Sequence, residues 1–328
     1  MESKEIIRTT LKTIISLSIG FVLLWLIYRK VNLDAVLEVM RTGVRYDILV
    51  GSLFFGLTAN IMRAIRWKLL INAMGEKPRT INIIWAVLGN YTINLILPRM
   101  GEVWRCAMIK KYDKISFTKL IGTLLVDRVS DVVAIGIITL LIMVFNVQFF
   151  TDFFSNNPTL MDGFIQLIQS PWLYIITVGF GIMIYILFRY MGHLSLIVRI
   201  KAVLKDIYEG LYTIIGLKHK EVFILETILI WVGYFIFFYA TFYAFSFTKD
   251  LGIVVGLITF TMGSIAIAVP VQGGIGPWHF MVIASLVLFG VDPNEAAAFA
   301  LIVHTTQTLW TALVGLVGVV ALPMMNEK

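Results

Sequence analysis

The sequence predicts an all-helical, polytopic membrane protein with about six spanning helices and two broken re-entrant hairpins arranged as inverted repeats. Of its 328 residues, 59% are hydrophobic and 14% are charged, with a mean hydropathy of +0.88, whereas soluble domains carry roughly 25% charged residues. Lipid must therefore solvate most of the chain, which requires helices because open sheet edges stay unpaired in lipid. The same short signal, Pro-x-x-Gly, interrupts the apolar sequence at Pro98 and at Pro270.

Six apolar stretches have the length of spanning helices, and the whole chain 1–328 reads as one transmembrane domain. They cover about residues 9–28, 48–70, 117–145, 172–190, 221–246 and 294–321. The first stretch follows basic residues, as a signal peptide does. Tyr28, Arg29 and Lys30 stand where a cleavage site would need small residues, so we expect a retained helix.

Loop charges predict which stretches cross the membrane fully. Residues 63–79 contain five basic residues and residues 99–119 contain six, so the positive-inside rule places both in the cytoplasm. The stretch 81–98 between them must then enter and leave on the cytoplasmic side, as a re-entrant hairpin. Residues 146–171 contain aspartates but no Lys or Arg and are expected outside, and the break within 252–290 enters from outside.

This topology places both termini in the cytoplasm and the protein in the inner cell membrane. It also leaves residues 29–45 outside despite their four basic residues, which counts against it. Leu33, Val36 and Met40 in that segment have helical spacing, so we expect a short interfacial helix. A second amphipathic helix is expected on the cytoplasmic surface at 197–214.

The two breaks form a pair 172 residues apart (270 minus 98). The same offset carries the stretch 48–70 to 220–242 and the stretch 117–145 to 289–317, close to two other spanning stretches. Each half then reads helix, broken hairpin, helix, with opposite orientations, as in many secondary transporters that bind substrate at the breaks. The alternative is that Pro and Gly only kink packed helices.

Within the single transmembrane domain, the sequence divides into four parts. They are 1–47 for the first helix and interfacial segment, 48–145 for repeat one, 146–220 for the connecting and amphipathic helices, and 221–321 for inverted repeat two.

Polar groups within the apolar stretches mark the candidate site, because a charge at the membrane centre costs about 2.5 to 3.5 kcal/mol on insertion scales. Asn60, Arg63 and Trp67 share one helix face with Arg66 beside them. A guanidinium there can bind a lipid phosphate through two hydrogen bonds. The alternative is that Arg63 and Arg66 mark the cytoplasmic end of the helix and extend to its surface.

Two further clusters come from the first half of the chain. Around the first break, the residues assigned to the substrate site are Asn94, Arg99, Glu102 and Arg105. Glu102 is expected to pair with Arg105 or Arg63, and a purely structural ion pair is the alternative. Farther along, Asp127 and Asp131 share a face at i, i+4 with Arg128 between them. This trio points to substrate binding or proton coupling, or else to an internal salt bridge.

The fourth cluster surrounds the second break. Its assigned residues are Gln272, Gly273, Gly274 and His279, together with His304 on the last helix. The glycine amides can form an anion-binding nest near the helix that starts at Pro277. For the two histidines, hydrogen-bonded packing is the alternative.

Searches for catalytic motifs find none. The chain has no His-Glu-x-x-His helix, no Gly-x-Ser-x-Gly elbow, no phosphate-binding Gly-x-x-x-x-Gly-Lys loop, and a single cysteine, Cys106. We expect no catalytic residue, no metal and no cofactor. The net charge of +7 comes largely from short loops between apolar helices, which indicates membrane phosphates and not nucleic acid as partners.

Three motifs in order give a family resemblance over nearly the whole chain. Residues 94–105 read NLILPRMGEVWR, residues 126–131 read VDRVSD, and residues 270–276 read PVQGGIG. They resemble the lysylphosphatidylglycerol synthase transmembrane-region family of flippase-like proteins. Gln272 stands where that family usually has a second proline, and Pro277 to His279 stand where Arg-Glu is frequent. The resemblance implies the lipid-translocating part, without the soluble aminoacyl transferase domain of the full-length synthases.

These observations predict a lipid translocase. The expected substrate is an anionic phospholipid or a polyprenyl-linked lipid, with membrane lipids as partners and a homo-oligomer compatible with the sequence. The alternatives are a membrane enzyme or accessory subunit of lipid or lipid-linked glycan synthesis, and a scaffold for another envelope enzyme.

The predicted topology can be tested by cysteine labelling in a Cys106→Ser background. A cysteine at Asn156 should react with an impermeant reagent from outside, and one at Lys110 only from inside. Labelling of both from one side would contradict the inverted-repeat arrangement.

Overall fold

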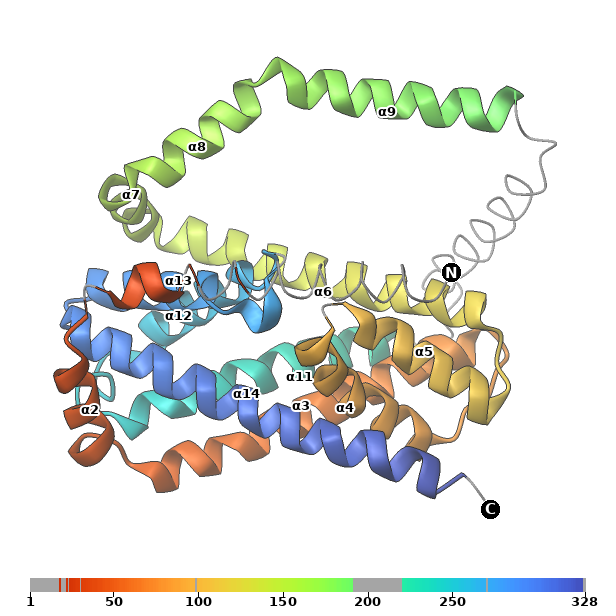
Figure 1. Cartoon of the computed structure of the whole chain (residues 1–328), viewed down its shortest axis with the longest axis horizontal. Helices are drawn as coiled ribbons and strands as arrows, with labels where there is room; N and C mark the ends of the chain where they lie inside the picture. The colour runs from red at the N-terminus through yellow and green to blue at the C-terminus, as the bar shows by residue number, and fades with distance from the viewer. Residues whose placement is uncertain are drawn as a thin grey trace.

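The computed structural model confirms an all-helical membrane protein. It describes residues 24–29, 31–97, 99–190, 220–269 and 271–326, with single positions 18 and 22. Four helices in this part are long and apolar enough to cross a membrane: α3 (Tyr46–Ala73), α6 (Phe117–Phe145), α11 (Lys220–Tyr239) continued by the 3-10 turn η1 (Ala240–Ala244), and α14 (Pro293–Met324). They match four of the six predicted spans and run lengthwise through the molecule (Figure 1).

The two other predicted spans are described less completely. The stretch 172–190 is the helix α9 (Pro171–Tyr190), which Figure 1 shows set apart from the bundle. The first predicted helix, 9–28, lies mostly outside the described residues, as does the whole predicted amphipathic helix at 197–214.

Two hairpins of short helices occupy the regions of the predicted breaks. The first joins α4 (Thr80–Ile96) to α5 (Met100–Asp113), and the second joins α12 (Gly252–Ala266) through the turn η2 (Gln272–Gly274) to α13 (Pro277–Leu288). The longest of the four helices, α4, has 17 residues and spans about 26 Å, short of a bilayer core of about 30 Å. The hairpins approach the middle of the bundle from opposite ends (Figure 1). Pro98 and Pro270 themselves lie outside the described residues, and membrane re-entry stays a prediction.

Much of the helix packing has the symmetry that an inverted repeat requires, although the packing of α3 on α6 has no comparably close counterpart between α11 and α14. In the first half the order is α3, α4, α5, α6, and in the second it is α11, α12, α13, α14. In this order α3 corresponds to α11, α4 to α12, α5 to α13 and α6 to α14. The packing of α4 on α14 then has its counterpart in that of α12 on α6, and the packing of α6 on α11 has its counterpart in that of α14 on α3. The pair formed by α3 and α11 maps onto itself. This three-dimensional pattern agrees with the 172-residue offset in the sequence.

Glycines allow α4 and α14 to approach closely. A Cβ atom built on Gly315 would lie 2.3 Å from the Thr92 hydroxyl oxygen and 2.6 Å from the Leu88 carbonyl oxygen, and one on Gly318 would lie 2.8 Å from the Trp85 carbonyl oxygen. The Thr92 hydroxyl donates a hydrogen bond of 2.7 Å to the Ala312 carbonyl across the same interface. Helices in lipid associate through small residues of this kind, because apolar burial gives them little driving force.

The loops predicted to be cytoplasmic meet at one end of the bundle. The Asp113 carboxylate after α5 accepts from the Arg79 backbone amide at 2.8 Å and from the Asn82 amide at 2.9 Å. Asn326, near the C-terminus, bonds to Asn82 at 2.8 Å. The two basic loops and the C-terminal end of α14 therefore lie on the same side, as the loop charges predicted.

The opposite end carries smaller helices. The predicted interfacial helix is α2 (Leu33–Thr42), capped by the Asn32 side chain. It packs against α14, with Val36 only 2% exposed, so it is part of the protein core and does not lie free on a membrane. The sequence did not predict α7 (Val147–Asn156) and α8 (Pro158–Gln169), which follow α6.

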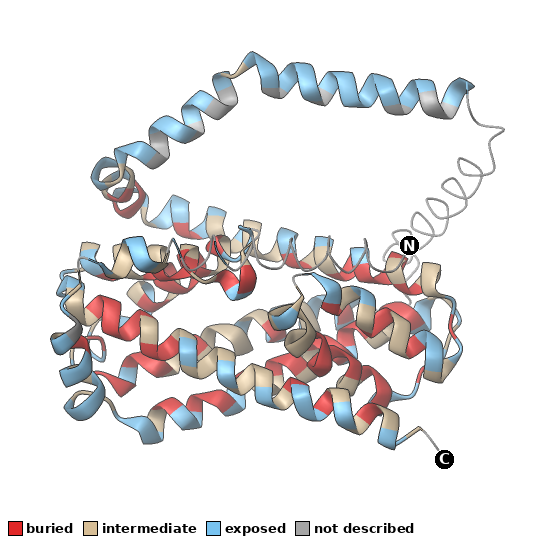
Figure 2. Ribbon diagram, viewed as in Figure 1, coloured by how far each residue is buried: buried red, intermediate tan, exposed pale blue. Residues whose placement is uncertain are grey.

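Burial follows the bundle interior, and apolar side chains cover its outside (Figure 2). On α6, Asp127 is fully buried, whereas Leu140 and Val144 nearer the other end are 62% and 70% exposed. Exposed aliphatic residues on a spanning helix are expected where lipid is the solvent. The polar interior is thus concentrated on the half of α6 that faces α3 and α5.

Glycine packing gives a stability test. Gly315→Ala forces the added methyl into backbone atoms of α4 and should destabilise the protein by about 1 to 3 kcal/mol, as overpacking does. Gly136→Ala on α6 is the matched control, because no atom lies within 4 Å of its added Cβ and alanine favours helix. Thermal unfolding in one detergent should rank Gly315→Ala below wild type and Gly136→Ala at or above it. Equal stabilities would refute the close packing.

Candidate functional site

Arg66 lies at the centre of the polar interior. Its side chain on α3 is fully buried and donates to the Asp127 carboxylate at 2.6 Å and to the Asp131 carboxylate at 2.7 Å. A further hydrogen bond of 3.2 Å reaches the Thr227 hydroxyl on α11. The structure does not favour the alternative that Arg66 only marks the end of its helix, because α3 continues to Ala73 and carries Arg66 about two turns inside.

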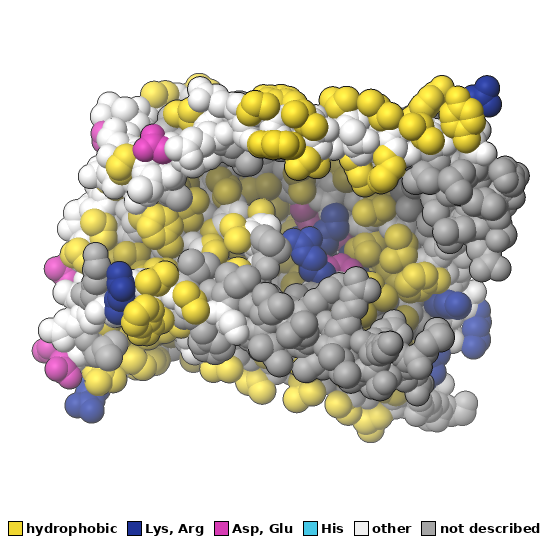
Figure 3. Space-filling view, turned by 45° about the horizontal axis from the view of Figure 1, so that its top comes forward, with side chains coloured by type: hydrophobic (Ala, Val, Ile, Leu, Met, Phe, Trp, Pro, Cys, Tyr) yellow, Lys and Arg dark blue, Asp and Glu magenta, His cyan; other side chains and the backbone are white. Residues whose placement is uncertain are grey.

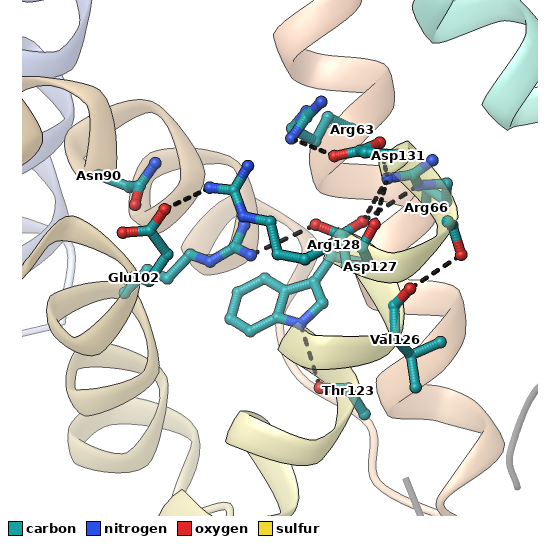
Figure 4. Close-up of polar contacts among 12 residues, drawn as sticks. Arg63, Arg66, Asn90, Glu102, Thr123, Val126, Asp127, Arg128 and Asp131 are labelled. Atoms are coloured by element: carbon teal, nitrogen blue, oxygen red, sulfur yellow. Dashed lines mark hydrogen bonds and ion pairs between the residues drawn. The ribbon is translucent and has the colours of Figure 1, made fainter. Parts of the chain in front are cut away.

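Two more arginines complete the buried ion cluster, which we define as Arg63, Arg66, Arg105, Asp127 and Asp131 (Figure 4). Arg63 lies 2.8 Å from Asp131, and Arg105 lies 3.3 Å from the second carboxylate oxygen of Asp127. The side chains of all five are at most 12% exposed. The i, i+4 spacing of the aspartates places both on the face of α6 that meets α3. They form salt bridges with arginines of α3 and α5, and not with Arg128 of their own helix as the alternative interpretation of this trio supposed.

The surroundings of the cluster fix its geometry. The Trp67 indole N–H donates to the Thr123 hydroxyl at 3.1 Å, and the Arg105 guanidinium lies 4.5 Å from the Trp67 ring centre. The cluster carries a formal charge of +1. Its ion pairs join α3, α5 and α6.

Arg128 and Glu102 form a second ion pair beside the cluster (Figure 4). The prediction that Glu102 pairs with Arg105 or Arg63 was wrong, because those arginines are occupied by the aspartates. The Arg128 side chain is 39% exposed and that of Glu102 is 20% exposed, and the second Glu102 oxygen is buried without a partner. Figure 3 shows charged side chains of both signs at the floor of a hollow bordered by hydrophobic groups.

Asn60 belongs to a polar chain that the sequence did not reveal. Its side-chain oxygen accepts from the Tyr234 hydroxyl at 2.7 Å, and the Tyr91 hydroxyl lies 3.2 Å from that of Tyr234. The Arg63 guanidinium lies 5.5 Å from the Tyr234 ring centre, and its Nε is buried without a partner. Tyrosines 91 and 234 were missed because an aromatic residue on an apolar helix gives no polar signal.

The tip of the first hairpin separates its predicted site residues. The Gly101 amide donates to the Asn94 side-chain oxygen at 2.8 Å, and a Cβ on Gly101 would lie 2.1 Å from the Asn90 carbonyl oxygen. Asn94 therefore stabilises the turn. Arg99 adopts a left-handed backbone (φ 61°) and its side chain is exposed, with no ion pair to any described residue. It remains available for a ligand.

The tip of the second hairpin touches the first. The Gln272 amide donates to the Leu95 carbonyl, and a Cβ on Gly273 would lie 3.4 Å from the Leu95 side chain. The Gly274 amide donates to the Val271 carbonyl at 3.4 Å, and the Gly276 amide donates to His279 at the same distance. The Gly274 and Gly276 amides of the predicted anion nest therefore already have acceptors, and anion binding at Gly273 stays a prediction.

The two ion-pair groups should differ in stability effect. Asp127→Asn leaves buried Arg66 and Arg105 short of counter-charge and should destabilise the protein by about 3 to 5 kcal/mol. Glu102→Gln breaks a partly exposed pair and should cost about 0 to 1 kcal/mol. Thermal unfolding in nanodiscs compares them, with Asp152→Asn on α7 as a control for loss of an exposed acid. Equal effects of Asp127→Asn and Glu102→Gln would contradict the division into a buried cluster and an accessible pair.

Comparison with known proteins agrees with the resemblance noted in the sequence. A UPF0104 membrane protein from Methanocaldococcus jannaschii is 29% identical over 136 residues, which is 40% of each chain. The match thus spans about two fifths of that relative. No solved structure matches the chain. The family profile described as the lysylphosphatidylglycerol synthase TM region matches residues 13–315, and the chain belongs to this family of membrane proteins.

Proposed function

We propose that this protein is a translocase that moves an anionic phospholipid or a polyprenyl phosphate across the inner cell membrane. The observation that carries the proposal is the partly exposed Arg128, held by Glu102 at the edge of the buried ion cluster. Arg99 at the neighbouring hairpin tip adds an exposed guanidinium. The open face therefore carries two cations and one carboxylate, which favours an anionic headgroup.

The lipid phosphate takes the place of Glu102 on Arg128. A phosphate binds a guanidinium in the same two-bond geometry as a carboxylate and carries at least equal charge. Displacement is inexpensive because the Arg128–Glu102 pair is partly exposed, whereas the aspartates keep Arg63, Arg66 and Arg105 in place. The acyl chains stay in the bilayer against the apolar outer faces of the helices.

The hairpins supply a path for the headgroup. Each enters the bundle from one end, and the tips meet where Gln272 contacts Leu95. Inverted hairpins of this kind surround the substrate sites of secondary transporters. The sequence has no phosphate-binding loop for ATP, so movement is downhill or driven by an ion gradient, with both termini in the cytoplasm.

We favour transport over enzymatic catalysis because of how the acidic groups are used. Asp127 and Asp131 each form ion pairs with two arginines. A carboxylate held in this way is a poor general base, since arginine strongly favours its charged form. Glu102 also has an arginine partner. These contacts support a binding role for the polar interior.

Lipid movement can be measured in liposomes containing the purified protein and a phospholipid labelled on its headgroup. Arg128→Gln should slow the loss of label accessibility at least tenfold, because a tenfold change corresponds to about 1.4 kcal/mol of lost phosphate binding. Arg45→Gln is the matched control, since Arg45 pairs with Asp47 at the end of α3. A wild-type rate for Arg128→Gln, or equal rates with empty vesicles, would reject the translocase. Formation of a new lipid product would favour an enzyme instead.

A further inference from the structure

The second hairpin contains one ionisable side chain. Residues 252–288 have no Asp, Glu, Lys, Arg, Cys or Tyr, and their single histidine is His279, which is 2% exposed. Its ring centre lies 4.6 Å from that of His304 on α14. Two histidines thus share one site at the tip of this hairpin, and the proposed phosphate site gives them no role.

Both imidazoles hold the tip loop between Val271 and Gly276. The Gly276 amide donates to His279 Nδ1 at 3.4 Å, and His304 Nε2 lies 2.9 Å from the Gly273 carbonyl oxygen. Because a carbonyl only accepts, His304 must carry its hydrogen on Nε2. His279 must keep a lone pair on Nδ1 and so carries its hydrogen on Nε2. Both contacts are formed by neutral rings.

The groups packed around the pair offer no counter-charge. The Tyr28 ring centre lies 6.0 Å from that of His279, and its hydroxyl donates to the Ala297 carbonyl. Trp278 lies against both imidazoles. Ionisable residues on the neighbouring helices, none in recorded contact with either ring, are Tyr91 on α4, Glu295 on α14 and Asp152 on α7. Two imidazolium ions 4.6 Å apart without a carboxylate would repel strongly, so the pair takes one proton at most.

A proton on His279 disturbs the tip. It must go to Nδ1, which then no longer accepts from Gly276. The charge also lies in the first turn of α13, at the positive end of the helix dipole. A proton on His304 goes to its Nδ1 and leaves the Nε2–H contact with the Gly273 carbonyl in place. The loop therefore loses a contact when His279 is the protonated ring, and this loop is the segment that touches the first hairpin through Gln272.

We propose that His279, paired with His304, is a proton-binding group whose protonation releases the Gly276 amide and opens the tip of the second hairpin. The site senses pH through local geometry and does not require a lipid substrate. Its partly exposed member, His304, gives the proton access. In a membrane with a proton gradient, the hairpin would open when protons reach this site from the side with the lower pH.

The experiment is a distance measurement between two spin labels in nanodiscs, between pH 4 and pH 8. Cysteines replace Val269 beside the tip and Leu309 on α14, which are 42% and 59% exposed, in a Cys106→Ser background. The label distance should change by at least about 2 Å, the scale of helix shifts in switching proteins. The change should follow a one-proton curve, complete over about two pH units.

Two substitutions preserve the neutral contacts and remove the titration. His279→Asn keeps an acceptor near the position of Nδ1, and His304→Gln keeps a donor near that of Nε2. The double variant should hold the high-pH distance throughout, whereas the control His193→Gln with His219→Gln should behave as wild type. If the label distance in the otherwise wild-type protein does not change with pH, the proposal is overturned even if no variant folds. It is also overturned if the label distance in the double variant still changes with pH. The readout needs no lipid movement, so failure here is distinct from failure of the translocase.

Discussion

The buried ion cluster is the interaction on which the first half of this protein depends. One buried charge without a partner costs several kcal/mol, yet three arginines and two aspartates from α3, α5 and α6 lie together inside the helix bundle. None of them is tolerable alone, because each needs the others as counter-charge. The helices that carry them are therefore joined by contacts that lipid cannot replace, and the position of α5 fixes that of the whole first hairpin.

The sequence predicted much of the frame and part of the site. Apolar length and loop charge located the long helices, and the Pro-x-x-Gly signals located the hairpins, because these features are local. The shared face of Asp127 and Asp131 followed from helical spacing alone. The partners of these charged residues on other helices could not be predicted, because residue spacing shows which face of its helix a residue occupies but not which helix lies opposite. For this reason Glu102 was paired with the wrong arginine, and the role of Arg66 was left open between phosphate binding and the membrane surface.

The two hairpins are alike in topology and unlike in the forces that hold them. The first is fixed through Arg105 in the ion cluster and through the Asn94 contact with Gly101. The second has no formal charge between residues 252 and 288 and is held by aromatic packing, the histidine contacts and Gln272. Ion pairs in a low-dielectric interior are costly to break one partner at a time, whereas a neutral hydrogen bond contributes about 0.5 to 1.5 kcal/mol. The second hairpin is thus the one that moves at lower cost.

We propose that this difference gives the two tips separate tasks. Where an anion must be held, the first tip offers permanent cations, and the neighbouring aspartates keep those cations in position without competing for the open face. Where the structure must change, the second tip offers groups whose charge is not permanent. A permanent charge at the second tip would need a fixed partner, and that partner would lock the loop. A neutral histidine pair needs none, so it can hold the loop closed through hydrogen bonds and release it when one proton is bound.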